Sequence, residues 1–290
     1  MRGLLSPQFL LLLIACVQAA NITTGNNNAG KLQNSNSRNQ SSQNDIDPVV
    51  INGYVVTDRR LGFAHLARIV FEPFPSLQSQ CTGSLISPSF VLTAGHCLVK
   101  GVFKIFRWKY KNFNVTLGDL STSETGETHE HTRSGIPLPF PFYPKFKTAI
   151  DPTDIGLLKI SPQANITDYT KPIALPPSSF ELPLNATVTV AGWGVSETGG
   201  DASDLLRWGS AQVDDSEACS AKLSTKQICL FDQARLQSSC NGDSGGPVMY
   251  DGYVVGTVSY GTTDCPLDSA WGAVRVSAYV TWIQIHTGTL

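Results

Sequence analysis

The sequence predicts an all-β domain that ends in one short helix. From Val50 onward, short runs rich in Val, Ile, Leu, Thr and aromatic residues alternate with clusters of Gly, Pro, Asn and Ser. Three of these runs are Phe90–Thr93, Thr187–Val190 and Tyr253–Val258. Such alternation is typical of a β-sandwich or a β-barrel. Helical periodicity occurs in one late stretch, where apolar residues have the i, i+3, i+4, i+7 spacing of a helix face: Val276, Tyr279, Val280 and Ile283.

The first residues predict a secretory signal. Arg2 provides the positive start, and Phe9–Ile14 lies in an apolar run that is too short to span a bilayer. Val17 and Ala19 have the small-residue spacing that signal peptidase accepts, so we expect residues 1–19 to be removed. No later run reaches transmembrane length, and we therefore expect a secreted, extracellular protein with no membrane partner.

Residues 20–49 contain mainly Asn, Ser and Gln, with scarcely any large apolar side chain. Such a segment cannot bury enough apolar surface to offset its ordering entropy, so we expect a disordered pro-segment. The rest is an ordinary globular mixture, and a formal net charge of −2 gives no reason to expect a nucleic-acid partner. The basic run Lys100–Lys111 is interleaved with aromatic residues, which favours a solvated hairpin.

The cysteines also favour an exported protein. Seven are present, and Cys16 leaves with the signal. Six remain, which indicates three disulfides, although six cysteines allow 15 pairings: Cys81, Cys97, Cys219, Cys229, Cys240 and Cys265. No Cys-x-x-Cys pair occurs, so a zinc site is disfavoured. Asn-x-Ser/Thr sequons, which are potential glycan sites, begin at Asn21, Asn39, Asn114, Asn165 and Asn185.

A candidate nucleophile lies in the glycine-rich segment Gly242–Pro247. Ser244, flanked by Asp243 and Gly245, can sit on a tight turn with its hydroxyl exposed. A serine hydroxyl is a weak nucleophile at neutral pH and needs a base. By itself, this segment is more often a simple loop.

His96 is the candidate base. It follows an apolar strand and precedes Cys97, whose disulfide would fix the backbone beside the imidazole. Asp154 precedes another apolar run, where its carboxylate would become buried and would need a hydrogen-bond donor. A histidine Nδ1–H could supply that donor. His129 and His131 form a His-x-His pair without an evident third ligand, so we expect no metal.

Taken together, these segments resemble the chymotrypsin-like (trypsin-like) serine protease family, from Val50 to the C-terminal helix. The chain order His96, Asp154, Ser244 matches this family and differs from the orders in subtilisin and the α/β-hydrolases. The resemblance implies a serine endopeptidase with no cofactor. His96 would be the base, Asp154 its orienting group and Ser244 the nucleophile.

The resemblance also implies the architecture of residues 50–290. Two antiparallel β-barrels, about 50–170 and 171–275, would hold the active site in the cleft between them, and a helix would cover about 276–287. The N–H groups of Gly242 and Ser244 would form the oxyanion hole. The segments Gly192–Gly194 and Ser259–Gly261 also match family segments, and the latter would pair with the substrate backbone. The implied disulfides are Cys81–Cys97, Cys219–Cys229 and Cys240–Cys265.

The activation segment departs from the family pattern. The resemblance implies a zymogen in which the ammonium of Val50, made by cleavage, pairs with Asp243. No basic residue precedes Val50, since the preceding residues are Asp45-Ile46-Asp47-Pro48-Val49. A trypsin-like activator therefore lacks its usual target. Self-activation after Val49 is one alternative.

The substrate pocket is predicted from the same resemblance. Ser238 corresponds to the pocket floor, and without a negative charge there a bound Lys or Arg would be buried unpaired. Trp271 falls on the pocket wall and would make the pocket shallow, while the small Ala273 nearby leaves some room. The remaining predicted pocket residues are Ser239, Ser259 and Gly261. We expect cleavage after apolar residues, as in elastase or chymotrypsin.

Two other classes remain open at this point. The chain could be a non-catalytic relative that binds a partner through the same cleft, or a carbohydrate- or lipid-directed hydrolase that uses the same triad. The complete triad favours the endopeptidase. The expected partners are protein or peptide substrates and protease inhibitors, and the expected state is a monomer. The sequence does not identify the physiological substrate or distinguish a digestive from a regulatory role.

Overall fold

The computed structural model describes residues 51–102, 106–123, 129–143, 150–197, 200–214, 219, 223–262 and 264–288. The signal and pro-segment predicted for residues 1–49 lie outside these residues, as does Val50. No helix among the described residues has both the length and the apolar character needed to cross a membrane.

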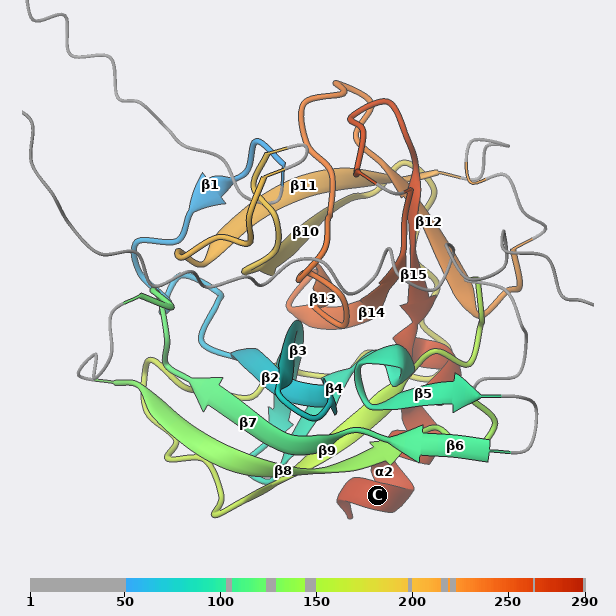
Figure 1. Cartoon of the computed structure of the whole chain (residues 1–290). Coiled ribbons are helices and arrows are strands. Elements are labelled where there is room, and N and C mark those ends of the chain that lie inside the picture. The colour runs from blue at the N-terminus through green and yellow to red at the C-terminus, as the bar shows by residue number, and fades with distance from the viewer. Residues whose placement is uncertain are drawn as a thin grey trace, which may run out of the picture. The chain divides into compact units, whose positions relative to one another are not determined.

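Six antiparallel strands close into the first barrel (Figure 1). Around the barrel they are β2 (Leu66–Phe74), β3 (Leu77–Ser87), β4 (Phe90–Thr93), β9 (Gly156–Ser161), β8 (His131–Pro139) and β7 (Lys111–Leu117). Because successive side chains of a strand point to opposite faces, every second residue can fill the barrel interior. The completely buried core of this barrel includes Ile69, Val115 and Leu158. A separate hairpin, β5 (Val99–Val102) with β6 (Phe106–Lys109), accounts for the basic run.

The second barrel is also a closed ring of six antiparallel strands. They are β11 (Arg207–Asp214), β10 (Thr187–Gly192), β13 (Pro247–Tyr250), β14 (Tyr253–Tyr260), β15 (Trp271–Arg275) and β12 (Gln227–Phe231). Val213 on β11 pairs with Leu230 on β12, and this pairing closes the ring. The short strand β1 (Tyr54–Val55) pairs with β11. The predicted fold class, two antiparallel β-barrels and a C-terminal helix, is confirmed.

Residues 162–186 connect the barrels and are bonded to both. The N–H of Ile173 donates to the carbonyl of Leu85 on β3 at 2.9 Å. One residue later, the carbonyl of Ala174 accepts from Val254 N–H on β14 at 3.0 Å. These bonds tie the crossover segment to one strand of each barrel.

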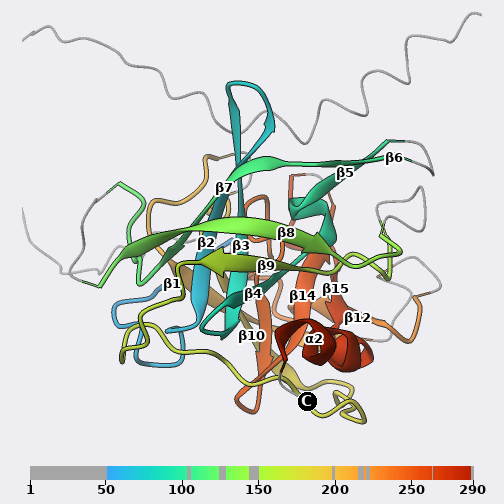
Figure 2. The same ribbon diagram turned by 90° about the horizontal axis from the view of Figure 1, so that it is seen from below.

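The C-terminal segment packs where the barrels meet (Figure 2). It consists of the 3₁₀ turn η3 (Val276–Tyr279) and the helix α2 (Val280–Thr287). Its four buried apolar residues are those that gave the helical spacing in the sequence: Val276, Tyr279, Val280 and Ile283. They share one apolar cluster with Leu92 and Leu157 of the first barrel and with Val254 of the second. The helix ends at Gly288, whose left-handed φ of 73° suits glycine.

Candidate active site

His96 lies on a short 3₁₀ turn at the end of β4. The turn η1 (Gly95–Cys97) follows Thr93 after one residue, and a disulfide joins Cys97 to Cys81 on β3. Gly95 leaves room for Tyr143, because a Cβ at this position would lie 2.9 Å from the tyrosine ring. The disulfide and this packing fix the backbone that carries the imidazole.

Asp154 binds His96 at two points. The backbone N–H of His96 donates to Asp154 Oδ1 at 2.7 Å, and His96 Nδ1 lies 2.8 Å from Asp154 Oδ2. An ionised carboxylate can only accept, so the proton of the second bond lies on Nδ1, and Nε2 of the neutral ring is the free acceptor. The carboxylate is buried, with the residue 3% exposed. Its oxygens therefore depend on protein donors.

The second barrel supplies a third donor to this carboxylate. Ser259 Oγ on β14 donates to Asp154 Oδ2 at 2.6 Å. The sequence predicted Ser259 as a pocket residue, and this bond to Asp154 was not predicted. Its only sequence signal is the match of Ser259–Gly261 to a family segment, because the two partners are 105 positions apart.

The loop before β9 holds Asp154 in place. Asp151 Oδ1 accepts from the backbone N–H of Thr153 at 2.8 Å and from its hydroxyl at 2.6 Å, which forms a tight turn. The phenol of Tyr279, on η3, donates to the carbonyl of Pro152. The C-terminal segment thus helps to position the carboxylate.

The protonation of His96 is controlled by its surroundings. Burial opposes the charged form, but the Asp154 charge and its hydrogen bond outweigh burial and raise the pKa of His96 above its ordinary value of 6.5. A base with a raised pKa accepts a proton more readily from a weakly acidic hydroxyl.

Ser244 lies on a turn that is hydrogen-bonded to both barrels. Its carbonyl accepts from Thr82 N–H on β3 at 2.9 Å, and Gly245 N–H donates to Val258 O on β14 at 2.8 Å. Gly245 has a φ of 76°, and a Cβ there would lie 2.0 Å from Thr93 Oγ1, so only glycine fits. Cys97 Sγ lies 3.6 Å from Ser244 O, which places the turn beside the His96 segment.

Two backbone donors at this turn face no acceptor. Within the described part of the chain, the N–H groups of Gly242 and Ser244 donate to no protein group, and no hydrogen bond joins Ser244 Oγ to His96. In enzymes without substrate, hydrogen bonds of the catalytic groups are often long or poorly aligned. Unpaired N–H groups beside a nucleophile can accept a developing negative charge.

Asp243 is buried between the nucleophile turn and the Gly192–Gly194 segment. Its Oδ1 accepts from Gly194 N–H at 3.0 Å, and its Oδ2 accepts from Cys240 N–H at 3.0 Å. A Cβ at Gly194 would lie 2.5 Å from Asp243 Cγ, which explains the glycine. Burial raises the pKa of Asp243 to about 7, although the two backbone bonds act in the opposite direction. Among the described residues, no cationic group pairs with it.

The residues that follow Val50 are bound close to the predicted pocket floor. The N–H of Ile51 donates to the carbonyl of Ser238 at 2.9 Å. Asn52 has a φ of 58°, and its Nδ2 donates to Leu236 O at 2.7 Å. Gln237 Nε2 in turn donates to the carbonyl of Asn52 at 3.1 Å. Three bonds thus anchor this segment to residues 236–238.

Three of the predicted pocket residues are nearly inaccessible, whereas Gly261 is exposed. Ser238, Ser239 and Trp271 are 5%, 6% and 2% exposed. Trp271 packs in the core of the second barrel, in the same cluster as Ala273. A Cβ at Gly261 would lie 3.4 Å from Trp271 Cβ, so the two positions face each other across β14 and β15. Trp271, which the sequence predicted as a pocket-wall residue, is thus part of the core of the second barrel.

The His-x-His pair does not converge on a common point. The ring of His129 stacks on Tyr169, with centroids 3.6 Å apart, and His131 Nδ1 faces the carbonyl of His129 at 3.2 Å. In the described residues, the one group of three close potential ligands is Cys81, His96 and Cys97. Its two cysteines form a disulfide, which leaves no thiolate for a metal.

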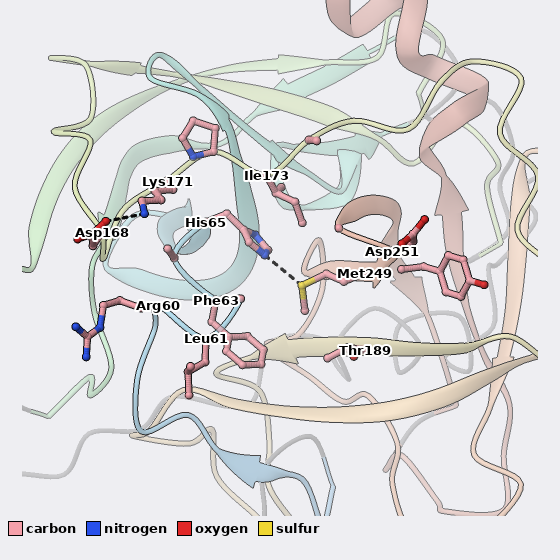
Figure 3. A pocket seen from close by; sticks show the side chains of 16 residues that line it. Arg60, Leu61, Phe63, His65, Asp168, Lys171, Ile173, Thr189, Met249 and Asp251 are labelled. Carbon is pink, nitrogen blue, oxygen red and sulfur yellow. Dashed lines mark hydrogen bonds and ion pairs between the residues drawn. The ribbon is translucent and has the colours of Figure 1, made fainter.

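A separate hollow of about 460 Å³ contains none of the predicted site residues (Figure 3). His65 points into it toward Met249, with Nε2 3.1 Å from Sδ. Burial, together with the charge of Arg59, lowers the pKa of His65 to about 3. This histidine is therefore neutral over the physiological pH range.

The disulfides and three kinds of comparison agree on the family. The structure contains Cys81–Cys97, Cys219–Cys229 and Cys240–Cys265, the three pairs that the resemblance implied. The family model described as Trypsin matches residues 65–283.

Duodenase-1 of Bos taurus is 34% identical over 208 residues, covering 70% of this chain and 76% of that protein. A serine protease of Anopheles gambiae is 34% identical over 206 residues, covering 70% of each chain. The solved structure of GrC superimposes with a TM-score of 0.70 at 26% identity, covering 82% of this chain and 99% of that one.

Proposed function

Because the chain belongs to the trypsin family and is a serine endopeptidase, we propose that Ser244 is its nucleophile, His96 its general base and Asp154 the carboxylate that orients the base. The observation that carries this assignment is the 2.8 Å contact between His96 Nδ1 and a carboxylate that three protein donors hold in place. This arrangement keeps the proton on Nδ1 and leaves Nε2 to receive the serine proton.

The reaction follows from these roles. His96 Nε2 takes the proton of Ser244 as Oγ attacks the peptide carbonyl carbon, and the free N–H groups of Gly242 and Ser244 bind the resulting oxyanion. The C–N bond then breaks, and the leaving amine takes the proton from His96. Water, activated by the same base, releases the acyl group from Ser244 and restores the enzyme.

Labelling with a serine-directed fluorophosphonate tests this assignment. We expect the chain with Val50 at its N-terminus to be labelled once, at Ser244, and to cleave peptides. Ser244→Ala should abolish both, while Ser121→Ala, at a buried serine outside the proposed triad, should abolish neither. A correctly processed, folded chain without labelling or cleavage would instead be a non-catalytic relative.

We also propose that the protein is a zymogen whose active form begins at Val50. Asp243 is buried, with no cationic partner in the part of the chain that the structure describes, and the anchored residues Ile51 and Asn52 would hold a Val50 ammonium in its neighbourhood. N-terminal sequencing of the active protein should start at Val50. If Ser244→Ala is never cleaved when expressed alone, and active enzyme added in trans cleaves it after Val49, the activation is autocatalytic.

The composition of the pocket supports a preference for apolar residues before the cut bond. Ser238, the proposed floor residue, carries no charge, and the proposed wall residue Trp271 is bulky. Substrates ending in Ala, Val, Leu, Phe and Arg should therefore rank with Arg last, because its charge would be buried unpaired. Efficient cleavage after Arg would overturn this preference.

Secretion and glycosylation belong to the same proposal. Asn114, Asn165 and Asn185 are exposed, so the oligosaccharide acceptors of three sequons are accessible in the folded chain. Asn21 and Asn39 lie outside the described residues. Peptide mass spectrometry of protein secreted by eukaryotic cells, before and after glycosidase treatment, should find glycans at these exposed sites. Protein retained inside the cells would contradict secretion.

A further inference from the structure

Thr82 connects the first barrel to the turn that carries the proposed nucleophile. It lies on β3 and is completely buried, directly after Cys81, whose disulfide partner is next to His96. Its backbone N–H donates to the carbonyl of Ser244 at 2.9 Å. Its hydroxyl donates to the carbonyl of Gly242, also at 2.9 Å.

These two hydrogen bonds hold the turn on both sides of Asp243. One fixes the peptide unit that follows Gly242, and the other fixes the unit that follows Ser244. Gly242 has a φ of 100°, a conformation from which glycine can easily rotate. The hydroxyl of Thr82 therefore restrains a residue whose backbone could otherwise rotate.

The surrounding contacts hold the Thr82 side chain in one orientation. A Cβ at Gly192 would lie 2.9 Å from Thr82 Oγ1, and a Cβ at Gly246 would lie 3.3 Å from Thr82 Cβ. The carbonyl of Thr82 accepts from Thr93 Oγ1 at 2.9 Å. The hydroxyl is thus placed before any substrate arrives, which is the condition for electrostatic preorganisation.

We propose that Thr82 is a positioning residue for the oxyanion hole. Its hydroxyl holds the carbonyl of Gly242, in the peptide unit that follows this residue. The preceding unit, which carries the Gly242 N–H, is held by the bond from Val195 N–H to the carbonyl of Asn241 at 2.8 Å, so the two bonds together fix the dihedral angles of Gly242 and the direction of its N–H. Loss of the hydroxyl removes one of these restraints, so the N–H can turn away from the oxyanion, and it leaves the half-buried carbonyl of Gly242 without this donor. This inference rests on the proposed function, since it requires Gly242 N–H to bind the oxyanion.

The test replaces the hydroxyl without changing the shape of the side chain. We expect Thr82→Val to lower kcat about 10-fold with KM within about twofold, because the oxyanion forms after the substrate has bound. Thr82→Ser keeps the hydroxyl and should keep kcat within about threefold of the original. A peptide aldehyde, whose adduct with Ser244 places an oxyanion in the hole, should bind Thr82→Val about 10-fold more weakly.

The matched control is Thr116→Val. Thr116 is also buried, on β7 of the first barrel, and its hydroxyl bonds to Thr132 Oγ1 at 3.1 Å, so its loss should not change kcat. Rates are expressed per site labelled by fluorophosphonate, which removes any effect of a misfolded fraction. If Thr82→Val keeps the original kcat, raises only KM, or is matched by Thr82→Ser, the positioning role is wrong. If the unmodified protein is not labelled at all, it is the proposed function that fails.

Discussion

Ser259 Oγ, on the second barrel, donates to the same carboxylate oxygen of Asp154 that binds His96 Nδ1, at 2.6 Å and 2.8 Å respectively. The proposed base and its orienting carboxylate come from the first barrel, so this hydroxyl makes their geometry depend on how the barrels dock. A hydrogen bond to the charged form of a carboxylate also lowers the attraction that the carboxylate exerts on a neighbouring cation.

Ser259→Ala removes this donor. We expect a several-fold lower kcat, and we expect the acid limb of the pH–rate profile to move upward by a few tenths of a pH unit. The shift follows because Asp154, with one donor fewer, stabilises protonated His96 more strongly. Steady-state kinetics between pH 5 and 9 measure both effects. An unchanged acid limb would show that the hydroxyl does not influence the pair.

The pH dependence of the unmodified enzyme follows from the same pair. Asp154 raises the pKa of His96 above 6.5 against the effect of burial, so kcat/KM should fall as the pH decreases through a value above 6.5. Asp154→Asn keeps the shape but removes the charge and should lower kcat by about 10⁴. Exposed Asp204, which contacts Thr122, offers a control, since Asp204→Asn should have no effect on the rate.

The burial of Asp243 predicts that the stability of the uncleaved chain depends more strongly on pH than that of the cleaved chain. In the uncleaved chain, burial raises the pKa of Asp243 to about 7 from an ordinary value of 3.8. The folded state then holds a proton that the unfolded state has released, so the free energy of unfolding should fall by a few kcal/mol as the pH rises from 4 to 8. Cleavage before Val50 supplies an ammonium, which should remove most of this decrease.

Urea unfolding at pH 4.5 and pH 8 compares the two forms. Both should carry Ser244→Ala, so that neither digests itself, and the cleaved form is made with added active enzyme. The same pH dependence in both forms would mean that the new N-terminus does not reach Asp243.

The sequence predicted the chemical groups better than the contacts between the barrels. Ser244, His96 and Asp154 stand out because each lies in a distinctive local segment, and the six cysteines outline the disulfides. The bonds from Ser259 to Asp154 and from Thr82 to Gly242 each join a strand of one barrel to a loop of the other. The docking of the barrels, which depends on packing of the whole core, decides such contacts, and no local pattern in the sequence shows which residues will meet.

The predicted pocket shows a different limit. Trp271 was placed on the wall by counting along the chain, but a strand shifted by one residue sends every side chain to the other face. In the structure, Trp271 pairs with Leu230 and packs in the barrel core. The sequence could identify the bulky residue, and only the strand register could show where the indole lies.

Trp271→Leu should enlarge the pocket. We expect the ratio of kcat/KM for substrates ending in Phe to that for substrates ending in Ala to rise at least several-fold, because leucine is smaller than the indole at the proposed pocket wall. The free energy of unfolding should fall by about 2–4 kcal/mol, because the indole is also part of the core.

Trp208→Leu, at a half-buried tryptophan that contacts Tyr54, serves as the control and should leave the ratio unchanged. A constant Phe-to-Ala ratio in the Trp271 variant would mean that the indole does not limit the pocket.

The buried His65 should lower the free energy of unfolding of the enzyme at acidic pH. Burial lowers its pKa to about 3 from the ordinary 6.5, so below pH 6.5 the unfolded chain binds a proton that the folded chain does not. Stability should therefore be lost as the pH falls from 6.5 toward 3, by about 2–3 kcal/mol at pH 4.5 for this group alone.

His65→Phe lacks the titrating ring and should lose less stability over this range, even if its stability at pH 7.5 is lower because the contact with Met249 is gone. His286→Gln, at an exposed histidine of α2, should follow the unmodified protein. The free energy of unfolding is measured with urea at pH 7.5 and at pH 4.5, with all three proteins carrying Ser244→Ala. The difference between the two values isolates the effect of the titrating group. Equal differences in all three proteins would rule out His65 as the group responsible.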